Sequence, residues 1–261
     1  MDFKTIILEQ LDDLAIIRMN RPKEMNTLNF ELTADLLKAL EVCWDDDTTK
    51  AVIITGSGKA FCAGGDVAAF RESEDIGDTT RQMTKLFNPF ISGIRRMDKP
   101  VIAMINGVCM GAGLSIAAAC DLRICAASAV FRQAYTSVGL TPDGAWGLNV
   151  PLLIGFGRAS ELIFTDPMID AKKAYEVGLV GEVVDDADLE KKTMEKVRRI
   201  VKGPLAAFAI AKENLNRAML PLLENQLEQE RLGIMEAGRT HDAREGIDAM
   251  LERRKPSFAG R

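Results

Sequence analysis

Apolar residues in the first 130 positions fall into short runs, and most of these runs end at a glycine or at paired polar residues. Residues 5–10 and 14–19 are rich in branched side chains and flank a pair of aspartates, which predicts a two-stranded hairpin. From residue 30 to residue 44, apolar side chains recur at helical spacing behind Asn29, a suitable N-cap. The chain is therefore predicted to begin with a hairpin and an amphipathic helix.

Two later stretches repeat one order of strand, glycine turn and helix. In the first, the apolar run 51–55 leads through the glycine-rich segment 58–67, GKAFCAGGDV, into a short helix. In the second, the apolar run 101–105 stops at an Asn-Gly pair and is followed by a small-residue helix at 114–120. This repetition predicts an α/β coil of strand-turn-helix units.

Gly111 and Gly113 open the second of these helices. The first N–H groups of a helix have no partner within it, and the peptide dipoles add partial positive charge at that end. Glycine on either side allows a ligand to approach the backbone closely. An anion would therefore be stabilised at Ala112, although a close-packed structural turn is the alternative interpretation of the same glycines.

The last third of the chain differs from the rest in composition and in its predicted secondary structure. Further predicted elements before it are helices at 81–97, 146–153, 160–164 and 171–177 and strands at 122–124 and 181–184. After about residue 187 the sequence is helical and highly charged, with predicted helices at 189–201, 204–219, 221–237 and 242–254. Because their apolar stripes need a covering surface, we expect residues 1–200 to form the core and residues 201–261 to form a helical region that contacts another subunit.

Composition narrows the possible functions. A net charge of −5 and a pI near 5.2 argue against nucleic acid and anionic membranes as partners. The N-terminus has no signal-peptide layout and no apolar run reaches about 20 residues, so we expect a cytoplasmic protein. The five cysteines form no CxxC pair and are expected to be buried free thiols. With His241 as the single histidine, a His-rich metal site or a Ser-His-Asp triad is improbable, and we predict no metal.

Several ordered segments resemble the enoyl-CoA hydratase/isomerase family, the crotonase superfamily. They are NRPKEMNTLN at 20–29, GKAFCAGGDV at 58–67 and KPVIAMINGVCMGAGLSIAAACDLRICAASAVF at 99–131, with VGLTPDGAWGLNVPLLIGFGRASEL, DAKKAYEVGLVGEVVD and EGIDAMLERRKPSFAG further on. The resemblance implies an α/β, crotonase-like (ClpP/crotonase) spiral of ββα units with a C-terminal helical trimerisation region. It also implies an acyl-CoA thioester substrate without another cofactor, and a homotrimer or a dimer of trimers.

The resemblance also assigns residues to the site. Two backbone N–H groups that stabilise a thioester enolate map to Gly65 and Ala112, and such donors are typically worth about 3–4 kcal/mol each. Further substrate and CoA contacts map to Glu24, Met25, Ala63, Gly64, Asp66, Val67, Gly111 and Tyr135. Arg21 and Lys23 could meet phosphates by charge or could be solvated surface residues.

Three positions distinguish the reactions that the resemblance allows. Hydratases of the family use two glutamates, and the matching residues here are Ser115 and Tyr135, neither of which is an ordinary base near neutral pH. Asp143, in a GLxPD segment, matches the carboxylate that several isomerases and an aryl-CoA dehalogenase use. We therefore expect an enoyl-CoA double-bond isomerase, either Δ3-Δ2 or a phenylacetate-type ring isomerase, with Asp143 as the proton shuttle. Burial beside Trp146 or Tyr135 would raise the pKa of Asp143.

Other interpretations stay open at this stage. A hydratase or lyase could hold water with Asp143 and Tyr135, and a non-catalytic acyl-CoA-binding protein could keep the fold without the chemistry. The dehalogenase interpretation lacks its histidine base, because His241 lies in the C-terminal helices and is expected to be structural or exposed. Asp121 is expected to be a structural carboxylate at a helix end.

Overall fold

The structure, a computed structural model, describes residues 3–261 apart from the side chains of residues 219 and 220. Its main sheet has six strands in the order β1-β2-β3-β5-β7-β10. The hairpin strands β1 (Ile6–Leu11) and β2 (Leu14–Met19) are antiparallel, and every later pairing in this sheet is parallel. The parallel strands are β3 (Ala51–Gly56), β5 (Val101–Ile105), β7 (Leu122–Ala126) and β10 (Glu182–Val184). The predicted hairpin is therefore confirmed.

A second sheet, in the order β4-β6-β8-β9, lies beside the first. It consists of β4 (Ala60–Cys62), β6 (Val108–Met110), β8 (Val130–Arg132) and the short β9 (Ile169–Asp170). Each of β3, β5 and β7 is followed directly by a strand of this second sheet, and the first two pairs then lead into helices. The chain thus repeats a ββα unit that contributes one strand to each sheet, as the family resemblance implies. The glycine-turn repeats predict the coil but not the second strand of each unit, which lies within the glycine-rich segment.

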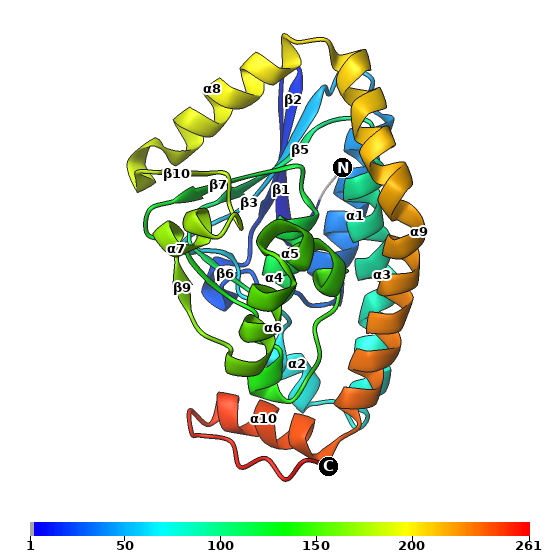
Figure 1. The fold of residues 1–261 in the computed structure, drawn as a ribbon, viewed down its shortest axis with the longest axis vertical. Helices are drawn as coiled ribbons and strands as arrows, with labels where there is room; N and C mark the ends of the chain where they lie inside the picture. Colours follow the sequence, from blue (N-terminus) through cyan, green and yellow to red (C-terminus); the bar gives the residue numbers. More distant parts are fainter. Residues whose placement is uncertain (1–2) are drawn as a thin grey trace.

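Ten α-helices surround and connect the sheets within the described residues. They are α1 (Phe30–Asp45), α2 (Val67–Arg71), α3 (Ile76–Arg96), α4 (Ala112–Ala119), α5 (Trp146–Ile154), α6 (Phe156–Thr165), α7 (Ala171–Glu176), α8 (Leu189–Val201), α9 (Leu205–Gly238) and α10 (His241–Leu251). In Figure 1, α1, α3 and α9 stand along one side of the molecule, α8 covers one end and α10 closes the other. The parallel strands are consequently covered by helices, as their continuous apolar runs require.

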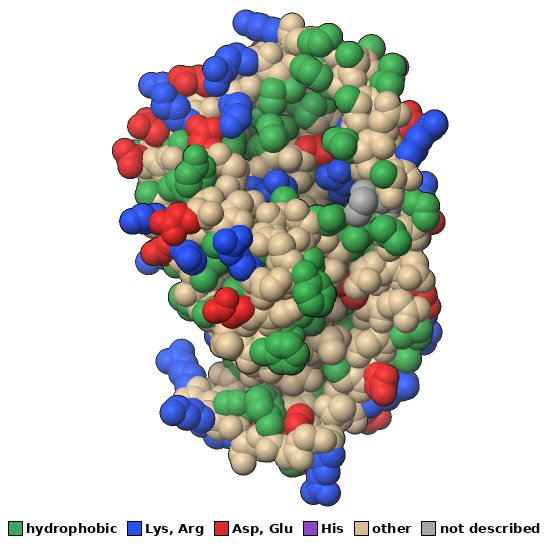
Figure 2. Space-filling model, viewed as in Figure 1, with side chains coloured by type: hydrophobic (Ala, Val, Ile, Leu, Met, Phe, Trp, Pro, Cys, Tyr) green, Lys and Arg blue, Asp and Glu red, His purple; other side chains and the backbone are tan. Residues whose placement is uncertain are grey.

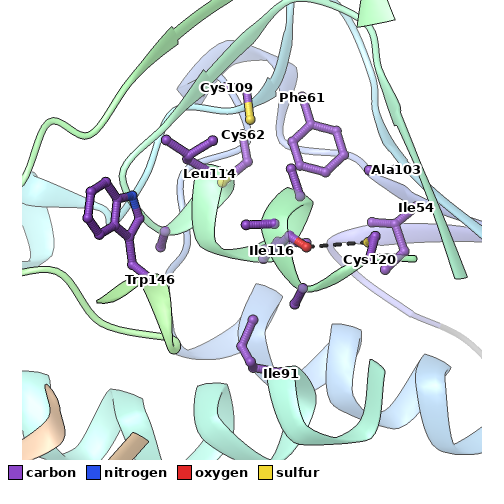
Figure 3. Close-up of a cluster of buried hydrophobic side chains, with 14 of the residues drawn as sticks. Ile54, Phe61, Cys62, Ile91, Ala103, Cys109, Leu114, Ile116, Cys120 and Trp146 are labelled. Atoms are coloured by element: carbon purple, nitrogen blue, oxygen red, sulfur yellow. Dashed lines mark hydrogen bonds between the residues drawn. The ribbon is translucent and has the colours of Figure 1, made fainter. Parts of the chain in front are cut away.

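Both faces of the main sheet are buried. One face, with Ile54 and Ala103, joins the large core that also holds Phe61 and the helix α4, and Figure 3 shows these side chains converging. The opposite face, with Ile53 and Ile102, packs against apolar residues of α8. The five cysteines are free and buried, as predicted, and Cys120 donates its thiol to the carbonyl of Ile116 at 3.3 Å.

Several predicted helix boundaries are wrong. The helix predicted at 160–164 begins at Phe156, and the one predicted at 242–254 ends at Leu251. Residues 204–219 and 221–237 form one 34-residue helix, α9, which continues through Pro221. Its packing along α3, which includes a 3.2 Å bond from Asn88 Nδ2 to the Leu227 carbonyl, outweighs the hydrogen bond that the proline removes. Helix α3 begins at Ile76, not near residue 81, because the Asp75 side chain caps it by accepting from the Asp78 N–H at 2.9 Å. The division at residue 200 into core and trimerisation region stays a prediction.

Candidate active site

The start of α4 lies where the second sheet meets the core. Gly111 precedes the helix with a φ of +52°, a conformation that glycine adopts without strain. A Cβ on Gly113 would lie 2.2 Å from the Cys62 carbonyl oxygen, so no larger residue fits against β4 at this position. Helix α4 is buried along its whole length. Its first N–H group, on Ala112, is therefore fixed in position and has no partner within the helix.

A second backbone segment lies directly against this helix start. A Cβ on Gly111 would be 3.3 Å from the Cα of Gly64, and Gly64 has a φ of +107°. Leu28 holds the segment from the other side, because its N–H donates to Gly64 and its carbonyl accepts from Asp66, at 2.8 and 2.9 Å. No protein acceptor is found for the N–H of Gly65 or of Ala112 among the described residues. The two predicted donors thus border one pocket.

This pocket gathers most of the residues that the sequence singles out. It is lined by Ala63, Gly64, Gly65, Val67, Gly111, Ala112, Tyr135 and Asp143. Its other walls are mainly apolar and come from Leu28, Phe70, Met83, Phe87, Ala134, Val138, Leu140, Ile234 and Met250. Ile234 and Met250 come from α9 and α10, and nothing in the sequence pattern shows that these helices fold back over the pocket.

Asp143 is held in a buried network with the two residues at the hydratase glutamate positions. The Tyr135 hydroxyl donates to Asp143 Oδ1 at 2.6 Å. The Ser115 hydroxyl donates to the backbone carbonyl of Asp143 at 2.7 Å and lies 3.1 Å from the Tyr135 oxygen. All three residues are buried. Ser115 and Tyr135 therefore orient the aspartate in addition to packing the helix and the pocket wall.

The pocket changes the acidity of its side chains. Burial raises the pKa of Asp143 to about 6, while the hydrogen bond from Tyr135 acts in the opposite direction and lowers it. The raised pKa of Asp143 has the direction that its predicted burial requires. Tyr135 opposes this shift, because its hydrogen bond stabilises the ionised carboxylate. Burial, followed by the charge of Asp143, raises the pKa of Tyr135 well above its ordinary value. Asp143 is thus the group suited to exchange protons near neutral pH, and Tyr135 is a hydrogen-bond donor.

The remaining predicted contacts do not line the pocket. Asp66 forms a 2.9 Å ion pair with Arg21, and Met25 accepts from the Ala63 N–H through its carbonyl at 3.1 Å. Glu24 and Met25 are exposed, on and just after a short 3-10 helix, Pro22–Glu24. This loop therefore supports the segment that carries Gly64 and Gly65, and a direct contact with CoA stays a prediction for these residues.

Two polar residues outside the pocket behave as the sequence indicates. Asp121 pairs with Arg95 at 3.2 Å and Lys212 at 2.6 Å, and it accepts from the Val101 N–H at 2.9 Å. The His241 side chain is 59% exposed and begins α10. Asp121 is thus a structural residue, and His241 is a surface residue.

Within residues 3–261 no cluster of three or more His, Cys, Asp or Glu side chains could hold a metal ion. Nor does any helix in that part of the chain combine the length and apolar character that a bilayer span requires. The chemistry that the pocket itself offers consists of backbone donors and one titratable carboxylate.

Solved structures share this architecture. A crystal structure of an enoyl-CoA hydratase from Mycobacterium avium subsp. paratuberculosis superposes with a TM-score of 0.90 and 28% identity, over 99% of this chain and 100% of that one. The fold is thus the crotonase spiral with its C-terminal helices. The model of the enoyl-CoA hydratase/isomerase family matches residues 9–261, and the chain belongs to that family.

Curated relatives agree over the full length. A probable enoyl-CoA hydratase of Rhodobacter capsulatus is 36% identical over 100% of both chains. The 1,2-epoxyphenylacetyl-CoA isomerase of Escherichia coli is 35% identical over 94% of each. Relatives at nearly equal distance thus bear the names of different reactions, so similarity alone does not select one.

Proposed function

We propose that the protein is an enoyl-CoA double-bond isomerase in which Asp143 moves the proton. The observation that carries the proposal is the combination of one titratable carboxyl group, with a pKa near 6, and two backbone donors in the same pocket. The positions at which hydratases of the family carry two glutamates hold Ser115 and Tyr135. Both bond Asp143 and neither supplies a second base.

The reaction follows from these positions. The Asp143 carboxylate removes a proton from the α carbon of a Δ3-enoyl thioester, and the electron pair moves onto the thioester oxygen as a dienolate. The N–H groups of Gly65 and Ala112 stabilise this oxyanion, at a typical value of about 3–4 kcal/mol per donor. Protonated Asp143 then returns the proton at the γ carbon, and the Δ2 double bond forms as the oxyanion collapses. No proton is gained or lost overall.

The acyl group would lie among apolar side chains. Phe70, Met83, Phe87 and Ile234 face the space between the backbone donors and α9. These walls favour an apolar acyl chain or ring and leave few polar groups to hold a water molecule for hydration. Among the relatives, the one named 1,2-epoxyphenylacetyl-CoA isomerase is consistent with a CoA thioester whose acyl part is a ring.

Isotope labelling distinguishes the candidate reactions. Purified protein is incubated with 3-hexenoyl-CoA and with 2-hexenoyl-CoA, in D₂O and in H₂¹⁸O, and the products are analysed by mass spectrometry. Double-bond migration with deuterium incorporation and without ¹⁸O is the expected result. Incorporation of ¹⁸O into a 3-hydroxyacyl product would show hydration, the alternative that the name of the Rhodobacter relative favours.

Asp143→Asn is the decisive variant, and Asp47→Asn is its matched control because Asp47 is exposed. The proton shuttle is supported if Asp143→Asn loses turnover but still binds acyl-CoA, while Asp47→Asn keeps normal turnover. Retained turnover in Asp143→Asn would refute it. If neither label enters with the wild type, aromatic acyl-CoAs are tested next, and binding without turnover would indicate a non-catalytic acyl-CoA-binding protein.

We further infer that the protein acts as a homotrimer or a dimer of trimers in the cytoplasm. Large apolar side chains are exposed on α6 and α9, among them Phe156, Phe164, Ile210, Leu215 and Leu222. In Figure 2 hydrophobic side chains gather over these helices. A patch of this kind favours burial against another subunit, and the five free thiols suit a reducing compartment. Light scattering after size exclusion gives the mass of the assembly.

A further inference from the structure

A second buried carboxyl group, Glu230 of α9, lies beside the loop that carries Asp143. Its Oε1 accepts from the Gly147 N–H at 2.8 Å, across 83 residues of sequence, and from Gln226 Nε2 at 2.8 Å. Glu230 is 8% exposed, and its Oε2 has no partner among the described residues. A carboxyl group is costly to bury, so its place on this loop needs an explanation.

The loop has no cap of its own. Helix α5 begins at Trp146, and the residue before it, Ala145, offers no side chain to accept from the first turn. Gly144 and Ala145 both have positive φ angles, of +68° and +59°, and the second is uncommon for a residue with a Cβ. The backbone between Asp143 and α5 is therefore strained, and it requires support from outside the loop.

Helix α9 supplies that support along one face. Residues 226 and 230 of this face contact Gly147, and a Cβ on Gly233 would lie 3.5 Å from Thr141 Oγ1. Ile234, one turn beyond Glu230, lines the pocket itself. In Figure 1, α9 runs along the whole side of the molecule past α5. On its other side the loop is held by Ser115, which bonds the Asp143 carbonyl.

We propose that Glu230 is a positioning residue, whose carboxyl group replaces the missing cap of α5 and thereby holds Asp143 in its buried orientation toward the pocket. The inference rests on the proposed role of Asp143 in proton transfer. Glu230 is not among the residues that line the pocket, and its Oε1 is bonded by Gly147 and Gln226.

The ionisation of the two carboxyl groups is consistent with this contact. Burial raises the pKa of Glu230 to about 7, and the charge of Asp143 adds to the increase. Tyr135 is the other titratable group near both. Because a raised pKa favours the neutral acid, a neutral amide at position 230 should preserve the cap that the acid provides.

Three variants test the role. Glu230→Ala removes the cap, Glu230→Gln retains an oxygen that can accept from Gly147, and Glu236→Ala is the matched control on an exposed position of the same helix. Should Glu230→Ala fail to fold by circular dichroism, Gly147→Ala takes its place, because the added Cβ would lie 2.9 Å from Glu230 Oε1 and displace it.

The first measurement needs no substrate. The carboxyl ¹³C signal of Asp143, assigned with Asp143→Asn, is titrated in the ligand-free enzyme. We expect Glu230→Ala to lower the pKa of Asp143 from about 6 toward its ordinary value, about 3.9, as the released loop admits water. Glu230→Gln and Glu236→Ala should leave it near 6. An unchanged Asp143 titration in folded Glu230→Ala overturns the proposal.

The second measurement uses turnover of the enoyl-CoA that the wild type isomerises. Misplacement of a catalytic group by about 1 Å can cost about 100-fold, so kcat of Glu230→Ala should fall by about 10- to 100-fold with KM nearly unchanged. Glu230→Gln should recover most of that loss. An equal loss in both variants would mean that the charge of Glu230, and not its cap, is required, and would overturn the proposal. If the wild type shows no turnover, the proposed function fails while the titration still tests the contact.

Discussion

The hydrogen bond from Tyr135 to Asp143 gives a quantitative prediction about the pH dependence of the reaction. The hydroxyl donates to the ionised form of the aspartate at 2.6 Å, inside a pocket where burial alone raises the pKa. A hydrogen bond to a charged group contributes about 1.5–3 kcal/mol, and about 1.4 kcal/mol corresponds to one pKa unit. Tyr135→Phe removes this bond together with the 3.1 Å contact to the Ser115 hydroxyl, which does not involve the Asp143 carboxylate. The pKa of Asp143 should therefore rise by about 1–2 units, from about 6 to between about 7 and 8.

The sign of the effect follows from the role of the carboxylate as the base. Turnover requires ionised Asp143, so kcat/KM falls as the pH decreases through the pKa of the free enzyme. In the wild type the fall should begin near pH 6, and in Tyr135→Phe it should begin between about pH 7 and 8. At pH 6 the variant should be about 5- to 50-fold slower than the wild type, whereas at pH 9 the two rates should be within about threefold.

The assay follows the ultraviolet absorbance of the conjugated thioester between pH 5 and 9, at constant ionic strength. Tyr175→Phe is the matched control, because Tyr175 is the only other tyrosine and its side chain is exposed. An acid limb that stays near pH 6 in Tyr135→Phe, or that moves to lower pH, would refute the assignment of Asp143 as the base or of Tyr135 as its donor.

Three further predictions concern the donors and the charges. Ala112→Pro removes one proposed oxyanion donor at the first position of α4, where proline is tolerated, so kcat should fall by about 10²–10³-fold in a variant shown by circular dichroism to be folded; a normal kcat would contradict that role. The pKa of Asp143 is higher in the folded chain than in the unfolded one, so its ionisation costs stability progressively between about pH 4 and 6, and the full cost is present above pH 6. Asp143→Asn should therefore increase the free energy of unfolding by about 2–3 kcal/mol at pH 8 and by almost nothing at pH 4, as urea titrations can measure. Asp121→Ala leaves two buried cations without their carboxylate and should cost about 1–3 kcal/mol of stability in the same titration, with kcat unchanged, whereas the exposed control Asp47→Ala should be neutral.

The residues of the oxyanion pocket could be predicted from the sequence because they depend on local backbone requirements. Glycine is required where φ is positive, as at Gly64 and Gly111, and where a Cβ would meet a neighbouring carbonyl, as at Gly113. Such requirements appear in the sequence as glycines between an apolar run and a small-residue helix. The positions of the turns, and with them Ala112, could therefore be placed on the chain before any tertiary contact was known, whereas Gly65 is assigned by the family resemblance.

The contribution of the C-terminal helix could not be predicted in this way. Pro221 indicates a break, and only the packing of α9 on α3 shows that the helix continues past it. Glu230 is one of many charged residues in a helical pattern, and its burial depends on the loop at Gly147, 83 residues away. Sequence periodicity places a residue on a face of its own helix, but it does not show which distant loop that face covers.

The pocket therefore has two parts. The backbone holds one part in place, and the identity of a few side chains determines the other. The backbone donors lie in glycine turns, and next to Ala112 a Cβ on Gly113 would lie 2.2 Å from the Cys62 carbonyl oxygen, so a larger residue at position 113 would disrupt the core. Asp143 and Tyr135 line the pocket, and the Ser115 hydroxyl bonds the Asp143 carbonyl and lies 3.1 Å from the Tyr135 oxygen. A change among them alters the acid-base chemistry without moving the donors. In the proposed reaction, enolate stabilisation would thus be fixed by the fold, while the fate of the enolate would depend on which proton carrier the loop between β8 and α5 presents.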